Sequence, residues 1–217
     1  MFPLYDESVP SRKLPFLTIS LIVINIFIFL FTYFSPDFER IIFEYGAIPA
    51  QILEGKSFPT LITSTFLHAG FLHLLGNMWF LWLFGDNVEH SLGKIKFIIF
   101  YLLCGILAGI FHIFLVTIQD INIPVIGASG AISGLLGGYL ILYPKNKIRA
   151  LFVLFFRPFI FSVPAFFYIG VWFLFQFLSV GELSSIAYFA HIGGFISGMI
   201  IILLLRRKVK RRNYLKV

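Results

Sequence analysis

The chain has 217 residues, of which 59% are hydrophobic and only 12% are charged, and its mean hydropathy is +0.94. A soluble domain of this length could not bury so much apolar surface, which excludes the ordinary soluble enzymes and binding modules. The net charge is +7, but seven of the basic residues follow Leu205 in a tail suited to anionic lipid headgroups, so we predict no nucleic-acid partner.

The apolar runs predict a polytopic protein with a single membrane domain over 1–217, whose core covers about 15–205. After a polar lead at 1–14, the run 15–34 is expected to stay as a membrane anchor, because it lacks a small-residue cleavage site. Residues 35–60 mix charged and apolar side chains, which indicates short amphipathic pieces in the membrane interface. Residues 206–217 form the basic tail.

Five further apolar runs follow, separated by charged or proline-containing turns. The stretch 148–180 is too long for one span and is interrupted at Pro158 and Pro164, so we interpret 148–161 as an interfacial segment. The fold class predicted is an all-α membrane protein, a six-transmembrane-helix bundle with a short central fourth helix. The spans after the first run from Leu61 to about Gly85, then over about 95–118, 126–143, 162–180 and 186–205.

The basic residues predict the orientation of these spans. Six spans place both termini on one side of the membrane, and a cytoplasmic N-terminus puts fourteen basic residues in the inside segments. The outside loops then hold only Arg40 and Lys56. Lysine and arginine collect on the cytoplasmic side of membrane proteins. We therefore expect a multi-pass protein of the cell (inner) membrane with both termini in the cytoplasm.

A serine between glycines opens the fourth apolar run, in Gly127-Ala128-Ser129-Gly130-Ala131. Such a serine is uncrowded, and the start of a helix presents free N–H groups, so Ser129 is a candidate nucleophile. The stretch differs from the nucleophile elbow of soluble hydrolases, in which a glycine stands where Ala131 does. The alternative is a plain helix-packing face, because small residues recur every four positions from Gly130.

Depth in the membrane relates Ser129 to His191. Each lies fourteen residues from the inner end of its span, or roughly 21 Å at ~1.5 Å per residue. Both are therefore expected at one level, below the outer surface of a hydrocarbon core of ~30 Å. Gly130 and Gly194 would allow their helices to approach closely. Residues 119–128 must then enter as non-helical backbone, which is tolerated where it lines a wet cavity.

Other polar residues in the spans have a structural alternative. His73 is predicted near the level of Ser129, with Asn77 one turn deeper on the same helix face. Either side chain could instead brace loop backbone, His191 could simply bond a neighbouring helix, and His68 reads as structural. The histidines do not have the spacing of a metal site, so we predict no metal and no cofactor.

Three motifs stand in order along the chain: His68-Ala69-Gly70-Phe71-Leu72-His73-Leu74-Leu75-Gly76-Asn77, Gly127-Ala128-Ser129-Gly130, and Ala190-His191-Ile192-Gly193-Gly194. With them the chain resembles the rhomboid intramembrane serine proteases of the bacterial six-helix kind over about 45–205. The resemblance implies a Ser129–His191 dyad without an acid. It also implies an oxyanion hole made by His73, Asn77 and the Ser129 backbone N–H, with Gly127, Gly130 and Gly194 in support. Its implied substrates are transmembrane proteins in the lipid bilayer, cleaved near the outer leaflet.

Two positions depart from that pattern. Many members have Trp-Arg where this chain has Ser57-Phe58-Pro59-Thr60, and some have an aromatic residue at the position of Ser133. Ser133 could orient His191, or it could simply be small enough for two helices to touch, which is the reading we favour. The rival functions are an inactive rhomboid-like protein that binds membrane helices and a transporter or channel; no matching broken helices support the latter.

Overall fold

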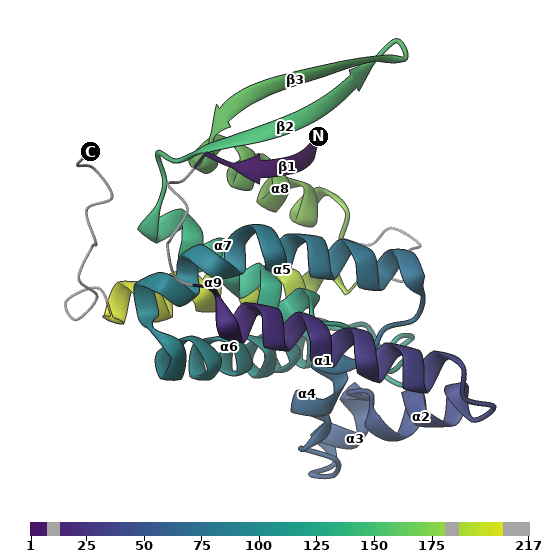
Figure 1. The fold of residues 1–217 in the computed structure, drawn as a ribbon. Coiled ribbons are helices and arrows are strands. Elements are labelled where there is room, and N and C mark those ends of the chain that lie inside the picture. The colour runs from purple at the N-terminus through teal and green to yellow at the C-terminus, as the bar shows by residue number, and fades with distance from the viewer. Residues whose placement is uncertain (8–13, 181–186, 206–217) are drawn as a thin grey trace.

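The computed structural model describes residues 1–7, 14–180 and 187–205, which are mostly helical (Figure 1). In the described part the helices are α1 (Phe16–Tyr33), α2 (Phe38–Tyr45), α3 (Pro49–Leu53), α4 (Thr60–Thr63), the short 3₁₀ helix η1 (Ser64–Phe66), α5 (Phe71–Leu92), α6 (Lys94–Leu115), α7 (Ser129–Leu142), α8 (Ala165–Leu178) and α9 (Tyr188–Leu205).

Three of the described helices, α1, α6 and α9, are long and apolar enough to cross a membrane. A fourth span results if α4 and η1 are joined to α5, from which they are bent by 97°. The helices α7 and α8 are apolar but have 14 residues each, or roughly 21 Å at ~1.5 Å per residue, short of the ~30 Å core. A membrane protein with three to four candidate spans is therefore shown, and the count of six stays a prediction.

Three antiparallel strands, in the order β1–β2–β3, correct the prediction of an all-α fold. They are β1 (Phe2–Asp6), β2 (Lys147–Leu154) and β3 (Arg157–Pro164), and they lie together beside α8 (Figure 1). The polar lead and the presumed interfacial segment thus pair through Phe2–Asp6 and 148–151. At the base of the hairpin Ile148 and Ala150 are buried, which is the alternation expected of a strand with one face packed.

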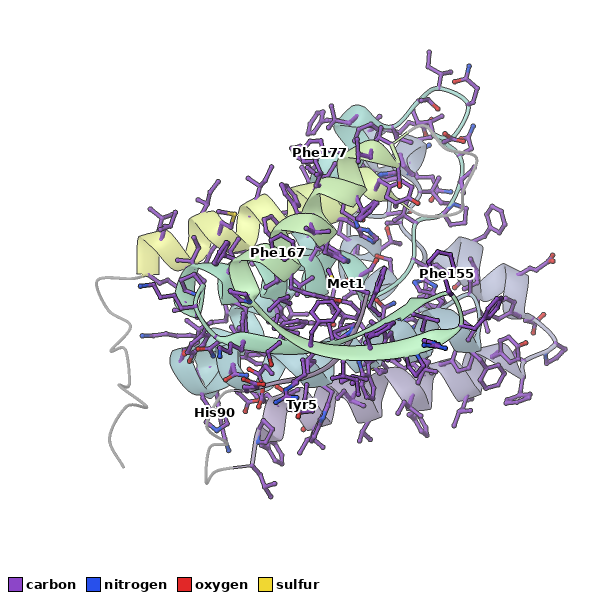
Figure 2. The ribbon with its side chains drawn as sticks, turned by 90° about the horizontal axis from the view of Figure 1, so that it is seen from above. Met1, Tyr5, His90, Phe155, Phe167 and Phe177 are labelled. Carbon is purple, nitrogen blue, oxygen red and sulfur yellow. The ribbon has the colours of Figure 1, made fainter. Side chains whose placement is uncertain are left out.

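The turn of this hairpin explains why the sequence did not reveal it. Phe155 and Phe156 form the two-residue connection with φ of 48° and 62°, and both are exposed; Figure 2 shows Phe155 at the tip of the hairpin. Positive φ at both central residues is the geometry of a type I′ turn, which normally takes Asn-Gly or Asp-Gly. Two phenylalanines gave no turn signal.

A buried acid holds α1 against α5. The carboxylate of Glu89, 5% exposed, accepts hydrogen bonds from the backbone N–H of Leu17 at 3.0 Å and of Thr18 at 2.8 Å. It also accepts one from the Thr18 hydroxyl at 2.8 Å. Free N–H groups at a helix N-terminus favour a negative charge, so Glu89 caps α1 from a different helix. Residues so far apart in sequence carry no local capping signature.

The most enclosed helix is α7, which packs against α5, α6 and α9. All ten of its residues from Gly130 to Tyr139 are buried. It runs parallel to α9 with backbone against backbone, since a Cβ at Gly194 would overlap the Gly130 carbonyl oxygen and one at Gly198 would overlap that of Gly134. Only glycines permit this approach, so the small-residue spacing in the sequence does describe a packing face.

Candidate active site

Ser129 is the first residue of α7 and is reached through irregular backbone. The segment before it is non-helical, as the sequence predicts. Two hydrogen bonds of 3.0 and 2.9 Å pair Ala47 with Val125, and the Gly127 N–H donates to the Ser64 carbonyl oxygen at 2.9 Å. The approach to the serine is therefore fixed by backbone pairing. At the start of a helix the N–H of Ser129 has no partner within α7 and is available to a substrate oxygen.

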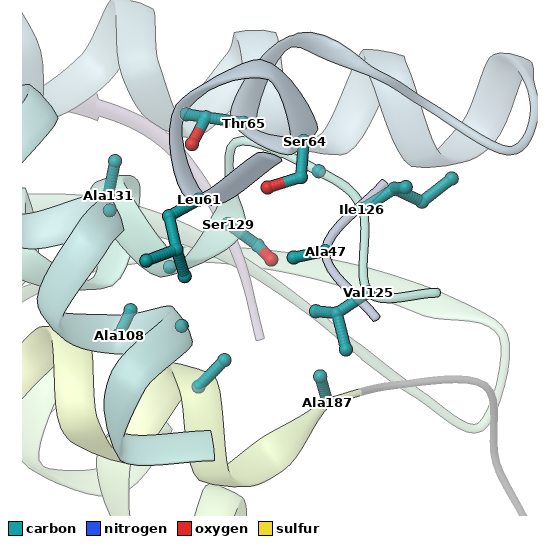
Figure 3. A pocket seen from close by; sticks show the side chains of 15 residues that line it. Ala47, Leu61, Ser64, Thr65, Ala108, Val125, Ile126, Ser129, Ala131 and Ala187 are labelled. Atoms are coloured by element: carbon teal, nitrogen blue, oxygen red, sulfur yellow. The ribbon is translucent and has the colours of Figure 1, made fainter. Parts of the chain in front are cut away.

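The Ser129 hydroxyl faces a small, partly open cavity, with Ser64 pointing into it from the opposite wall (Figure 3). The cavity has a volume of about 30 Å³, which is room for roughly two water molecules. Its other walls are small side chains from several elements, including Thr65, Ala108, Ala187 and Ala190. The hydroxyl-bearing residues Ser129, Ser64 and Thr65 and space for water thus meet at the N-terminal end of α7.

His73 and Asn77, on α5, converge on Gly127, which precedes Ser129 by two residues. A Cβ at Gly127 would lie 2.7 Å from His73 Nε2 and 3.6 Å from Asn77 Nδ2, and its φ of 118° disfavours any other residue. The Asn77 side chain is 7% exposed, yet its Nδ2 has no hydrogen-bond partner among the described residues. A buried donor without an acceptor is costly, and a bound carbonyl oxygen or oxyanion would satisfy it.

His68 lies beside this pair but does not enter the cavity. It is fully buried at the bend between η1 and α5, and its ring centroid is 5.1 Å from that of His73 in an edge-on arrangement. This placement favours the structural reading of His68 over a chemical one.

His191 lies in the first turn of α9 and close to the level of Ser129. The parallel contact with α7 places the Ala190 carbonyl oxygen 4.0 Å from a Cβ built at Gly130, and Ala190 lines the cavity that Ser129 faces. Ser129 and His191 both lie in the described part of the chain, and no hydrogen bond joins the Ser129 hydroxyl to His191 in this structure. Such bonds are often long in the absence of substrate. The helix packing is consistent with the depth count, and the Ser129–His191 dyad stays a prediction.

Two contacts of the site were not found from the sequence. His191 Nδ1 lies 2.8 Å from the Oε1 of Gln176 on α8, and the Trp172 ring lies 6.3 Å from the His191 ring. The only signal available was that a glutamine inside an apolar span is costly. Ser133, by contrast, donates its hydroxyl to the Ser129 carbonyl oxygen at 2.7 Å and is 1% exposed. It does not bond His191, which favours the packing reading of Ser133.

The loop that lacks Trp-Arg is braced by its own hydrogen bonds. The Ser57 hydroxyl donates to Gln51 Oε1 at 3.1 Å, and the Thr60 hydroxyl donates to the Ser57 carbonyl oxygen at 2.6 Å. No cluster of three histidine, cysteine, aspartate or glutamate side chains suited to a metal ion occurs in residues 1–7, 14–180 and 187–205. The expectation of a metal-free site stays a prediction.

Comparison with known proteins places the motifs in a family. The Rhomboid domain model matches residues 55–208. The chain is 30% identical to "Rhomboid protein 1, mitochondrial" of Saccharomyces cerevisiae, over 76% of this chain and 46% of that protein. It is 42% identical to "Putative rhomboid protease YdcA" of Bacillus subtilis, over 38% of this chain and 40% of that protein. It is also 35% identical to "Inactive RHOMBOID-like protein 8" of Arabidopsis thaliana, over 63% and 35%. The chain thus spans less than half of the length of each of these relatives.

Proposed function

We propose that this chain, which belongs to the rhomboid family, is an intramembrane serine endopeptidase that cleaves a peptide bond in or near transmembrane segments of membrane-protein substrates. The protein would be a single membrane domain of the bacterial six-helix kind, with α7 as its short central fourth helix. The basic residues support a cell-membrane location with both termini cytoplasmic.

One observation carries the proposal: the backbone contact between α7 and α9. It supports the proposal because Ser129, the first residue of α7, and Ala190, the neighbour of His191 in the first turn of α9, line the same small cavity. Hydrolysis by a serine needs a nucleophile, a base within reach and room for water, and it works best where bulk water is excluded. Near Gly127, which also lines this cavity, lies the amide donor of Asn77, which is buried and has no partner among the described residues.

The reaction begins when His191 Nε2 accepts the Ser129 hydroxyl proton as Oγ attacks the substrate carbonyl carbon. The carbonyl π electrons move to its oxygen, which is held by Asn77 Nδ2, His73 and the Ser129 backbone N–H. Collapse of this intermediate breaks the C–N bond, and the leaving amine takes the proton from His191. A water then gives a proton to His191 and attacks the acyl carbonyl carbon. Collapse of this second intermediate breaks the ester C–O bond, and Ser129 Oγ takes the proton back from His191 as the acid leaves.

Substrate must present an extended bond to this site. A transmembrane helix hides its carbonyl groups in its own hydrogen bonds, so the substrate has to unwind locally before attack. A site sunk below the outer surface, beside helices that lipid surrounds, suits a substrate that arrives within the bilayer.

The test is to treat the purified full chain with a serine-directed fluorophosphonate and to map the adduct by mass spectrometry, alongside cleavage of a membrane-anchored substrate. We expect the adduct on Ser129, and loss of both adduct and cleavage in Ser129→Ala and His191→Ala. Ser20→Ala is the matched control, because that hydroxyl only bonds the Phe16 carbonyl oxygen on an exposed helix surface.

Near-wild-type turnover in folded Ser129→Ala would refute the dyad. The alternative function is an inactive rhomboid-like protein that binds membrane helices, and one relative is named as inactive. Binding of a transmembrane peptide without any adduct or cleavage in the wild type would favour that alternative.

A further inference from the structure

His191 has its second ring nitrogen tied to α8, and that bond defines which nitrogen carries the proton. His191 Nδ1 lies 2.8 Å from Gln176 Oε1. The Gln176 side chain is 8% exposed and its other amide atom is also bound: Nε2 donates to the Trp172 carbonyl oxygen at 3.1 Å. The amide is therefore held at both ends.

The direction of these two bonds follows from their chemistry. A backbone carbonyl oxygen only accepts, so the Gln176 atom that faces Trp172 must be the NH₂ group; the reverse orientation would bring two acceptors together. The oxygen of the amide then faces His191 and can only accept as well. Nδ1 of a neutral imidazole must supply the hydrogen, which leaves Nε2 with its free lone pair.

Aromatic side chains hold the plane of the same ring. Trp172 lies one turn before Gln176 on α8, and its ring is 6.3 Å from His191 with 30° between the planes. Tyr188 approaches edge-on at 6.3 Å and 85°. Ser133 contributes neither a bond nor a ring, because its hydroxyl is bound to the Ser129 carbonyl oxygen. In this chain α7 neither orients the His191 ring nor stacks on it. Both functions come from side chains on α8 and α9.

We propose that Gln176 is the positioning residue of His191: it fixes the Nδ1–H tautomer so that Nε2 is free to accept the Ser129 proton, while Trp172 holds the ring plane. This inference rests on the proposed function for its catalytic meaning. In a Ser-His-Asp triad the acid performs this task, and loss of the correct tautomer there costs about 10⁴ in kcat. A neutral amide performs it here without placing a charge inside the membrane, where charge is costly.

The experiment measures the tautomer directly, by ¹⁵N NMR of histidine-labelled full chain in detergent micelles. We expect the His191 signals, assigned by their loss in His191→Ala, to show a protonated Nδ1 and an unprotonated Nε2 in the wild type. Gln176→Met, of similar size and without the amide acceptor, should give a mixture of tautomers. In Gln176→Glu burial favours the neutral carboxyl, whose O–H can donate to the Trp172 carbonyl oxygen and whose other oxygen can accept from Nδ1–H, so the Nδ1–H tautomer should be kept.

Kinetics on the same variants separate positioning from folding. For Gln176→Met we expect kcat to fall roughly 10- to 100-fold, the range typical when a partner that orients a histidine is removed, with KM and the melting temperature kept. Gln176→Glu should restore most of kcat. Phe175→Met, at the preceding residue of α8, which is 59% exposed, is the matched control and should change neither readout.

The inference is overturned if wild-type His191 carries its proton on Nε2, or if Gln176→Met leaves kcat unchanged. Should Gln176→Met lose stability, the wild-type spectrum and Gln176→Glu still decide the matter. The proposed function fails separately, through the absence of a fluorophosphonate adduct on Ser129, and the NMR result needs no substrate. An active enzyme with an Nε2–H tautomer would therefore reject only the role of Gln176.

Discussion

Replacing Gly130 by alanine tests whether helix packing sets the catalytic geometry. A Cβ at Gly130 would lie 2.7 Å from the Ala108 Cβ on α6, whereas nonbonded carbon atoms pack at about 3.5–4.0 Å. Both residues are buried, so α6 and α7 must separate by about 1 Å, the difference from the packing distance. Since a 1 Å misplacement of reacting groups can cost about 10²-fold in rate, we expect kcat to fall about 100-fold in Gly130→Ala. Overpacking of a core also costs about 1–3 kcal/mol, so the melting temperature should fall.

Rescue distinguishes this steric reasoning from other effects of the substitution. Removing the opposing methyl group in Gly130→Ala/Ala108→Gly should restore most of kcat in a cleavage assay with a membrane-anchored substrate. Gly170→Ala on α8 is the control, because nothing lies within 4 Å of a Cβ at that position. Its kcat should be unchanged. Wild-type turnover in Gly130→Ala, or a double variant as slow as the single one, would refute the reasoning.

Three further predictions concern single side chains. Asn77→Ala should lower kcat by about 10²–10³-fold, as loss of one oxyanion donor does, and a change confined to KM in steady-state kinetics would make Asn77 a substrate-binding residue instead. Ser133→Ala should leave turnover nearly unchanged, whereas Ser133→Leu should lower both the melting temperature and turnover, because Ser133 is 1% exposed. A loss of turnover in Ser133→Ala close to that in Ser129→Ala would contradict the packing reading. Hydrogen bonds from Ser162 at 2.5 Å and Arg149 at 2.6 Å lower the pKa of Glu7. The stabilisation of β1 by the Glu7 carboxylate is therefore complete above the ordinary pKa of 4.5 and is lost as the pH falls through the lowered pKa. Hydrogen exchange of β1 amides should therefore be faster in Glu7→Gln than in the wild type at neutral pH, and a difference that persisted in acid would exclude this origin.

The sequence was informative where one physical variable decides the outcome. Apolar runs long enough for the bilayer predicted the positions of α1, α6 and α9 to within a few residues, because membrane insertion depends mainly on hydropathy and length. The levels of Ser129 and His191 followed from the constant rise of a helix. Glycine spacing indicated the α7–α9 contact because no larger residue permits it.

Features that depend on contacts distant in sequence were not accessible in this way. The hairpin of β2 and β3 turns on Phe155 and Phe156, which have none of the residue preferences of a tight turn. Glu89 caps a helix whose bonded residues, Leu17 and Thr18, lie 72 and 71 residues before it in the sequence. Gln176 lies 15 residues from His191, on a neighbouring helix, and the contact between α8 and α9 brings the two side chains together.

The proposed nucleophile and the proposed positioning groups stand on different helices, and this determines how variants of the site should be interpreted. Ser129 stands on the helix whose next ten residues are all buried, so contacts that place it also stabilise the fold, and substitutions that add volume at those ten positions should change melting temperature and kcat together. The positioning groups stand on α8, which has many exposed side chains and on which Figure 2 shows Phe167 and Phe177. Because α8 contributes little to the central packing, a change at Gln176 can alter the base without loosening the nucleophile. Apart from substitutions of Ser129 itself, a fall in kcat at constant melting temperature is therefore expected from α8 and not from α7, and that contrast separates positioning from packing in one set of measurements.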